Sequence, residues 1–122
     1  MLAKRGRDRI HVGRAGEHYV AYLLEQAGLE TSRVDGACDL HVTLSSGRIL
    51  RVDVKTSSKM SKGFYKFGRN KSQADVYALV AIEEGPLVRF LPEAEIPRVT
   101  ICIRDFTEEL QAQELEWIAA ME

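Results

Sequence analysis

Apolar residues recur at helical spacing between residues 13 and 30. The stripe consists of Val20, Leu23, Leu24 and Ala27. Gly28 then supplies a residue type that commonly ends helices, so the pattern predicts a helix over "GRAGEHYVAYLLEQAGLE". Counting back along the stripe reaches Gly16 and Glu17, and we therefore expect Glu17 to extend the core-facing side. The helix macrodipole favours an acid near a helix N-terminus, but it does not account for this alignment.

The next apolar residues alternate with polar ones, which is the period of a β-strand. The alternating apolar positions are Leu40, Val42 and Leu44, followed by Leu50, Val52 and Val54. A Ser-Ser-Gly turn at residues 45–47 separates the two runs. The pattern therefore predicts a β-hairpin.

The register of this hairpin decides which polar residues meet. A three-residue turn pairs Leu40 with Val52. It then sets Asp39 directly opposite Asp53. A register shifted by two residues instead sets Asp39 opposite Lys55. In both registers Asp39, Asp53 and Lys55 lie together on the face that points away from the apolar set.

The rest of the chain predicts more strands, a long loop and a closing helix. The expected elements are a short edge strand at 30–35, a polar loop at 56–74 with a short helix near its end, strands at 75–82, 87–91 and 99–103, a turn at 83–86, and a helix at 107–122. The strand at 75–82 is apolar enough for the interior of a sheet. The closing helix carries its apolar residues on one side, namely Leu110, Trp117, Ile118 and Met121.

The composition is that of a single globular domain. The chain has 122 residues, of which 45% are hydrophobic and 29% charged. No apolar run approaches the roughly 20 residues that span a bilayer, and the first residues lack the apolar core of a signal peptide. Cys38 and Cys102 do not have the spacing of a metal site. We therefore expect buried thiols in a reduced, cytoplasmic setting.

The net charge of −1 conceals a strong separation of charge along the chain. Residues 1–16 sum to +4, residues 55–74 carry six basic residues and no acid, and residues 83–122 sum to −7. Local basic segments attract a polyanion even when the whole protein is weakly acidic. The alternative interpretation is that these basic segments are solvated tails and loops that bind no ligand. Judged by charge alone, this alternative is favoured.

The opposed aspartates need a physical explanation, because like charges on neighbouring strands destabilise a sheet. Three arrangements offset the repulsion: one carboxyl is protonated, Lys55 bridges the pair, or a divalent cation lies between them. Mg²⁺ is typically held by one or two carboxylates, with water and phosphate as its other ligands. A lysine beside such a cation orients an attacking water or stabilises growing charge on a phosphate. These residue types suit phosphodiester hydrolysis.

This combination resembles the PD-(D/E)xK nuclease superfamily over roughly residues 13–91. The matching positions are Gly13 to Glu17, Asp39, Asp53-Val54-Lys55 and the following Thr56. Within the superfamily the chain is most similar to the small stand-alone branch, which includes archaeal Holliday-junction-resolvase-like and intron-encoded endonucleases. The chain departs from the pattern at Cys38, where the motif has proline.

The resemblance implies a restriction-endonuclease-like core and roles for four residues. Asp39 and Asp53 would be metal ligands, Lys55 the catalytic lysine, and Glu17 a metal or water ligand. The implied cofactor is Mg²⁺, with Mn²⁺ as the second cation. The resemblance also implies a homodimer, because cutting both strands needs two sites related by a two-fold axis. The structural alternative is a sheet rim stabilised by an Asp–Lys–Asp network.

Basic residues near the motif are expected to contact a nucleic-acid backbone. They are Lys59, Lys62, Lys66, Arg69 and Lys71 after the motif, and Arg14 before it. Tyr65 or Phe67 would stack on an exposed base; alternatively, the loop is solvated and its aromatic residues close over the core. His41 shares the face of the aspartates, although a surface strand histidine is the simpler interpretation. The acidic C-terminal helix is expected to face away from DNA or to pack against a partner subunit.

Together these features predict one α/β domain with a mixed central sheet flanked by helices. Its expected parts are a basic N-terminal arm at 1–12, the motif region at 13–91 and a C-terminal helix at 105–122. The predicted function is a Mg²⁺-dependent endonuclease that cuts branched (Holliday-junction) or site-specific DNA. The rival is a non-catalytic nucleic-acid-binding module that keeps the nuclease fold. A third interpretation is a protein-interaction domain. Failure to bind DNA even at low salt, where phosphate contacts are strongest, would support it.

Overall fold

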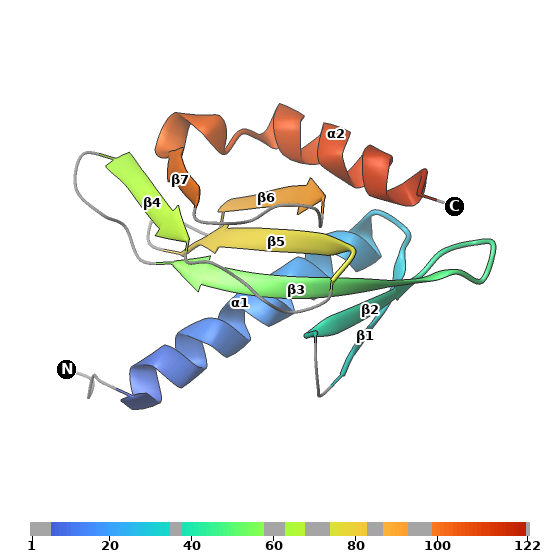
Figure 1. Ribbon diagram of the computed structural model, residues 1–122, viewed down its shortest axis with the longest axis horizontal. Coiled ribbons are helices and arrows are strands. Elements are labelled where there is room, and N and C mark those ends of the chain that lie inside the picture. Colours follow the sequence, from blue (N-terminus) through green and yellow to red (C-terminus); the bar gives the residue numbers. More distant parts are fainter. Residues whose placement is uncertain are drawn as a thin grey trace.

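The described residues form a five-stranded mixed sheet, two α-helices and a separate two-stranded ribbon (Figure 1). The computed structural model describes residues 6–34, 38–57, 63–67, 74–82, 87–92 and 99–121, with residues 6–10, 92 and 99–103 described as backbone only. The elements are α1 (Gly6–Gln26), β1 (Glu30–Arg33), β2 (Leu40–Thr43), β3 (Ile49–Ser57), β4 (Phe64–Phe67), β5 (Val76–Ala81), β6 (Leu87–Pro92), β7 (Val99–Cys102), a 3-10 helix (Ile103–Asp105) and α2 (Glu108–Ala119).

The main sheet has the strand order β1-β2-β3-β5-β6. β1, β2 and β3 are antiparallel neighbours, β3 and β5 are parallel, and β5 and β6 are antiparallel. This mixed sheet confirms the predicted α/β class, and β1 is the predicted edge strand. All of β5 is buried between its neighbours, as its uninterrupted apolar sequence predicted.

The β2–β3 hairpin has the first of the two registers considered above. Leu40 pairs with Val52, and Val42 pairs with Leu50. Gly47 lies in the turn with a φ of 95°, in the left-handed region that favours glycine. The structure thus has the register given by a three-residue turn, one of the two that the sequence left open.

α1 begins at Gly6, well before the start expected at Gly13. Residues 6–12 of the predicted basic arm are therefore helical and continuous with the rest of α1; residues 1–5 lie outside the described chain. The sequence contains no proline in this stretch. A glycine inside a helix costs only about 1 kcal/mol relative to alanine, so Gly13 weakens the helix without starting it.

The end of α1 is a Schellman motif centred on Gly28, which has a φ of 88°. The Leu29 N–H donates to the Leu24 carbonyl at 2.9 Å. The predicted stripe is buried at Val20, Leu23 and Leu24. Ala27 is exposed, because the chain leaves the helix there, and its assignment to the stripe was wrong.

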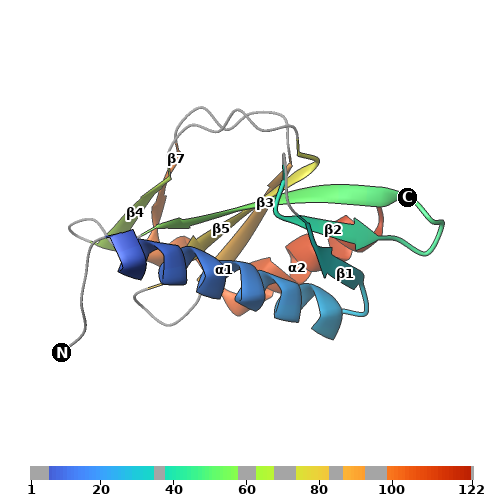
Figure 2. The ribbon, with the colours of Figure 1, turned by 90° about the horizontal axis from the view of Figure 1, so that it is seen from below.

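Apolar clusters lie on the two faces of the sheet. On one face α1 packs against alternate residues of the central strands, including Val52, Val54, Val76, Ala78 and Val80. On the other face the ribbon residues Tyr65 and Phe67 pack with Tyr77, Leu79, Ala81 and Phe106. Figure 2 shows α1 on one side of the sheet and β4 and β7 on the other. The sheet is therefore the middle layer.

Residues 56–74 do not form one long loop, contrary to the prediction. β3 continues to Ser57, and β4 forms a strand that pairs antiparallel with β7. The two strands of this ribbon are far apart in the sequence, so no local hairpin signal indicates their pairing. The short helix expected near the end of this segment and the turn expected at 83–86 fall outside the described residues, apart from residues 74 and 75, which are not helical.

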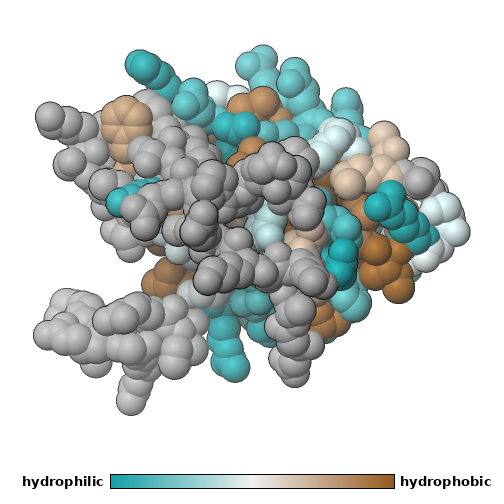
Figure 3. All heavy atoms as spheres, viewed as in Figure 1, coloured by the Kyte–Doolittle hydropathy of each residue, from teal (hydrophilic) through white to brown (hydrophobic). Residues whose placement is uncertain are grey.

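α2 forms the predicted closing helix and lies alongside β6 (Figure 1). The Thr107 hydroxyl caps it by accepting the Leu110 N–H at 3.1 Å. Ile118 is buried, whereas Trp117 stays partly exposed. On the face shown in Figure 3, hydrophilic side chains predominate around the hydrophobic patches of the coloured surface. None of the helices in the described ranges is long and apolar enough to cross a membrane.

Candidate functional site

The two opposed aspartates meet beside β3, directly before the start of β2. β2 begins at Leu40, which pairs with Val52, so no β2 residue pairs with Val54. The Asp39 carboxylate takes that place and accepts the Val54 N–H at 2.8 Å. The Asp39 backbone N–H donates to the Val52 carbonyl at 3.0 Å. The side chain of Asp39 therefore extends the β-ladder and is held against β3.

Asp53 is the buried charged residue of the described chain, with 6% of its surface exposed. It pairs in register with Tyr77 of β5, on the face of the sheet that the ribbon covers. The Lys55 ammonium lies 3.9 Å from the Asp53 carboxylate, and 39% of the Lys55 side chain is exposed. Lys55 is thus near enough to offset the charge of Asp53 and still accessible to a ligand.

Burial is the main cause that raises the pKa of Asp39 to about 7. A hydrogen bond with the Asp53 carboxyl raises this pKa further, as do the negative charges of Asp53 and Glu17, whereas the Val54 N–H lowers it. In the absence of a cation, a proton on Asp39 and the ammonium of Lys55 therefore offset the repulsion. The proton is one of the three arrangements that the sequence left open, whereas Lys55 contacts Asp53 and is not shown to bridge the pair.

Asp39 and Asp53 also suit a divalent cation. Their carboxyl oxygens are hard ligands held next to each other, and a cation can replace the proton that they share. Among the residues the structure describes, however, no three His, Cys, Asp or Glu side chains are grouped to hold a metal. The donor set is a pair of carboxylates, which is within the range that Mg²⁺ uses when water and phosphate complete its shell.

Glu17 has a different immediate partner. Its carboxylate accepts a hydrogen bond from Arg33 of β1 at 2.9 Å. The negative charge of Glu17 nevertheless acts on Asp39, as the weakest of the effects that raise its pKa. Arg33 was not singled out in the sequence, because its contact depends on how α1 crosses β1.

The close approach of α1 to β3 depends on Gly16. A Cβ placed on Gly16 would lie 2.2 Å from the Thr56 hydroxyl oxygen. That hydroxyl is buried and has no hydrogen-bond partner within the described part of the chain. Gly16 thus lets the helix approach the strand that carries Asp53 and Lys55, and it directly precedes Glu17. The sequence placed Gly16 and Glu17 on the core-facing side but gave no sign of the contact with Thr56.

The residues expected to bind nucleic acid fall into three groups. Arg14 on α1 and Lys66 on β4 are exposed. Lys59, Lys62, Arg69 and Lys71 lie outside the described residues. Tyr65 and Phe67 are 0% and 2% exposed, so the prediction that one of them stacks on a base was wrong. Phe64 is the exposed aromatic residue of β4, because the side chains of a strand alternate between its two faces.

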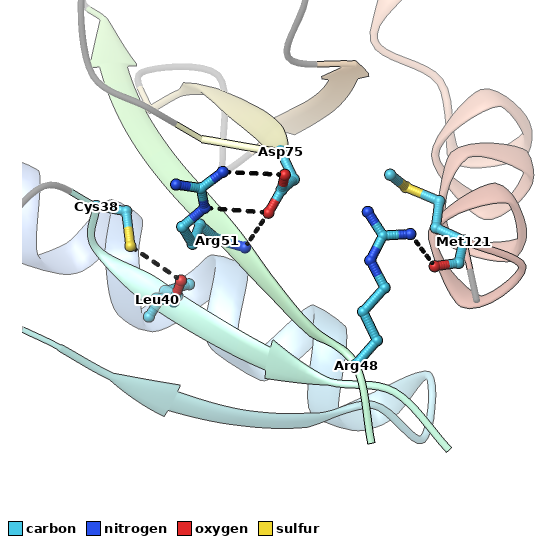
Figure 4. A network of polar contacts seen from close by, with 6 residues as sticks. All are labelled: Cys38, Leu40, Arg48, Arg51, Asp75 and Met121. Carbon is cyan, nitrogen blue, oxygen red and sulfur yellow. Dashed lines mark hydrogen bonds and ion pairs between the residues drawn. The ribbon is translucent and has the colours of Figure 1, made fainter. Parts of the chain in front are cut away.

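A second polar network supports the start of the parallel β3–β5 pair (Figure 4). The Arg51 N–H donates to the Asp75 carboxylate at 2.8 Å, and the Arg51 guanidinium contacts the same carboxylate at 3.3 Å. Burial opposes ionisation of Asp75, but the hydrogen bonds and charge of Arg51 outweigh it and lower the pKa of Asp75. The sequence offered no signal for this pair, because Arg51 lies on β3 and Asp75 lies just before β5, far apart in the sequence.

Two other contacts in Figure 4 concern predicted features. The Arg48 guanidinium donates to the Met121 carbonyl at 2.9 Å and joins the hairpin to the end of α2. Cys38 is buried, as predicted, and its thiol lies 3.7 Å from the Leu40 carbonyl. Burial and the charge of Asp39 raise the pKa of this thiol. His41 is half-buried and pairs in register with Arg51.

Comparisons with known proteins identify the fold. No family model matches the chain, and no curated protein matches it by sequence. Among solved structures, the bacterial homing endonuclease I-Ssp6803I is similar, with a TM-score of 0.69 and 18% sequence identity. The match covers 89% of this chain and 92% of that one. The chain therefore has an α/β fold like that of a known nuclease.

Proposed function

We propose that the protein is a metal-dependent DNA endonuclease of the PD-(D/E)xK type. The observation that carries this proposal is the pair Asp39 and Asp53, held side by side with Lys55 3.9 Å from Asp53. The likeness to a structure named as a homing endonuclease supports the same reaction class. Catalytic groups of these types are needed for hydrolysis of a phosphodiester.

The cofactor in this proposal is Mg²⁺, with Mn²⁺ as a substitute. Asp39 and Asp53 would hold it, and Glu17 would join directly or through water once its contact with Arg33 is released. When bound, such a cation would act as a Lewis acid at the scissile phosphate. Asp39 would give up its proton on binding, since a carboxylate and not a carboxylic acid is the ligand.

Lys55 has the remaining chemical role. Its ammonium is exposed enough to meet a phosphate and is oriented by Asp53. In the proposed reaction it orients the attacking water and stabilises the negative charge that grows on the phosphate. DNA is the proposed substrate because Lys55, Lys66 and Arg14 offer exposed cations to a polyanion. A homodimer would supply the second site for double-strand cutting.

The test is cleavage of labelled duplex, single-stranded and four-way-junction DNA in Mg²⁺, Mn²⁺ or EDTA. Asp53→Asn and Lys55→Met should each reduce cutting by about 10²-fold or more. Glu116→Gln, a change at an exposed acid of α2, is the matched control and should cut like the wild type. Cutting that survives EDTA or Asp53→Asn would contradict the proposed site.

Two observations favour a second candidate, the non-catalytic nucleic-acid-binding module. The described residues contain no three-ligand metal group, and Glu17 is engaged by Arg33. The same experiment separates the candidates: a chain that binds DNA but cuts no substrate in either metal is the module. A chain that neither binds nor cuts would make the aspartate pair a structural feature of the sheet.

A further inference from the structure

Phe64 is an exposed aromatic ring on an otherwise firmly packed strand. The neighbouring side chains of β4 alternate, so that Tyr65 and Phe67 are buried while Phe64 and Lys66 face outward. Tyr65 packs edge-to-face on Phe106 with ring centroids 5.8 Å apart. Phe64, in contrast, is 40% exposed. The buried face of the strand thus holds its outer face in a fixed position.

β4 contacts β3, the strand that carries the proposed catalytic lysine. Lys55 and Ser57 are two residues apart on β3 and so point to the same face of that strand. The Ser57 hydroxyl donates to the Lys66 carbonyl at 2.7 Å. A polymer whose phosphate contacts Lys55 would therefore pass close to β4 with its neighbouring units.

The charge of this region selects the kind of polymer. Residues 55–74 contain six basic residues and no acid, so the segment that contains β4 favours a polyanion. A cation beside an exposed aromatic ring is the combination that binds nucleic acid by phosphate contact and base stacking. A base can reach such a ring only where it is not fully stacked in a duplex.

We propose that Phe64 stacks on an unstacked DNA base beside the scissile phosphate, while Lys66 contacts the backbone. This inference rests on the proposed nuclease function and deepens it. It names as the preferred substrate class DNA whose base stack is interrupted, such as mismatched, branched or single-stranded DNA. Phe64 is in this view a positioning residue, since it touches the substrate away from the reacting atoms.

Fluorescence anisotropy with three labelled DNA probes tests the inference. The probes are a continuous duplex, the same duplex with a two-base mismatch, and a single strand. All proteins carry Asp53→Asn to prevent cutting. The variants compared on this background are Phe64→Leu, Phe64→Tyr, Lys66→Met and, as the matched control, Tyr22→Leu. Tyr22 is 56% exposed on α1, the helix that packs on the opposite face of the sheet.

Phe64→Leu keeps an apolar side chain on the strand but removes the ring. It should weaken binding of the mismatched and single-stranded probes about 10-fold, in line with roughly 1–3 kcal/mol per stacked base, and weaken the continuous duplex less. Phe64→Tyr and Tyr22→Leu should bind like the background protein. Lys66→Met should weaken the binding of all three probes alike. It should also reduce the slope of log affinity against log salt concentration by the amount expected for about one phosphate contact.

Three results would overturn the inference, and they are distinguishable. If Phe64→Leu has an unchanged melting temperature and binds every probe like the background protein, Phe64 does not contact a base. If Phe64→Leu alters only the sedimentation behaviour of the protein, the ring belongs to a contact between protein chains. If the background protein and the wild type in EDTA both bind no probe, the proposed nuclease function fails together with the inference.

Discussion

In the folded protein the Asp39 carboxyl has a pKa of about 7, whereas an exposed aspartate has a pKa of about 4. Between these values the folded chain retains a proton that the unfolded chain has lost. The free energy of unfolding of the metal-free protein should therefore fall as the pH rises from about 4 to 7, by up to about 1.4 kcal/mol per pH unit. Below pH 4 and above pH 7 this contribution no longer changes.

Urea unfolding in EDTA at pH 5 and at pH 7.5 measures this effect. Asp39→Asn keeps the shape of the side chain and removes its titration, so its stability should fall less than that of the wild type over the same interval. The lowered pKa of Asp75 makes the free energy of unfolding rise with pH, but at lower pH than this interval. This effect is present in both the wild type and Asp39→Asn. An equal fall in both proteins would refute the assignment to Asp39.

The contact between Arg33 and Glu17 tests whether Glu17 takes part in metal binding. Exposed ion pairs contribute about 0.2–1 kcal/mol, and Arg33 is nearly half exposed. Arg33→Ala should therefore raise the affinity for Mn²⁺ by up to about five-fold, because Glu17 is no longer engaged. Isothermal titration calorimetry without DNA gives the affinity.

Glu17→Gln separates a direct role of this carboxylate from a general change in charge. In the Glu17→Gln background, Arg33→Ala should leave the Mn²⁺ affinity unchanged if Arg33 acts through Glu17. A gain of the same size in both backgrounds would mean that Arg33 acts only by long-range repulsion, and Glu17 would then lose its proposed place near the cation.

At the scale of elements, the packing of α1 on β3 is a tight contact between Gly16 and Thr56. Gly16→Ala would place a methyl group 2.2 Å from the Thr56 hydroxyl. Overpacking of this kind costs about 1–3 kcal/mol, which exceeds the helix propensity that alanine gains over glycine. We therefore expect Gly16→Ala to lower the free energy of unfolding by about 1–2 kcal/mol in urea titrations.

Thr56→Ala provides the complementary change, because it removes the hydroxyl that the new methyl group would meet. The double variant should recover most of the stability lost in Gly16→Ala, with a coupling energy of 1 kcal/mol or more. Additive effects of the two substitutions would show that the helix adjusts its position freely. Gly13→Ala is the matched control and should not be destabilising, since among the described residues nothing outside the helix's own backbone lies within 4 Å of a Cβ at that position.

An element could be predicted from the sequence when the element that it pairs with lies nearby along the chain. The hairpin register depends on an alternation and a turn within a few residues of each other, so the meeting of Asp39 and Asp53 was predictable. β4 pairs with β7, which lies beyond two further strands. Its alternation of buried and exposed residues could be interpreted only once that partner was known, and so the exposed aromatic residue was misassigned.

The candidate site shows the same division. Asp39, Asp53 and Lys55 belong to one hairpin and were predicted from it. The contacts of Glu17 with Arg33, and of Gly16 with Thr56, arise where α1 crosses the sheet. Helix periodicity indicates which side of α1 faces the sheet, but it does not give the crossing position. These contacts therefore required the three-dimensional structure.

At the scale of the whole molecule, α2 protects the last strand of the sheet. β6 is an edge strand, and an exposed edge invites pairing with other chains. The Glu114 carboxylate on α2 accepts the Phe90 N–H and a hydrogen bond from the Arg89 side chain, both at 2.8 Å. Both charged side chains are mostly buried. Glu114 therefore joins the closing helix to β6.

Glu114→Ala should lower the free energy of unfolding by about 2–4 kcal/mol, because it leaves the Arg89 guanidinium and the Phe90 N–H without this partner. Glu114→Gln retains an oxygen for the N–H and should cost less. Glu108→Ala, at an exposed acid of the same helix, is the control and should have little effect. Urea titrations followed by circular dichroism provide the measurement, and equal losses for the two Glu114 variants would refute the role of the hydrogen bond to β6.

Since α2 lies away from the Asp39–Asp53 pair, Glu114→Ala should affect stability and not the proposed catalysis. At temperatures and urea concentrations well below its unfolding midpoint, this variant should cleave DNA like the wild type.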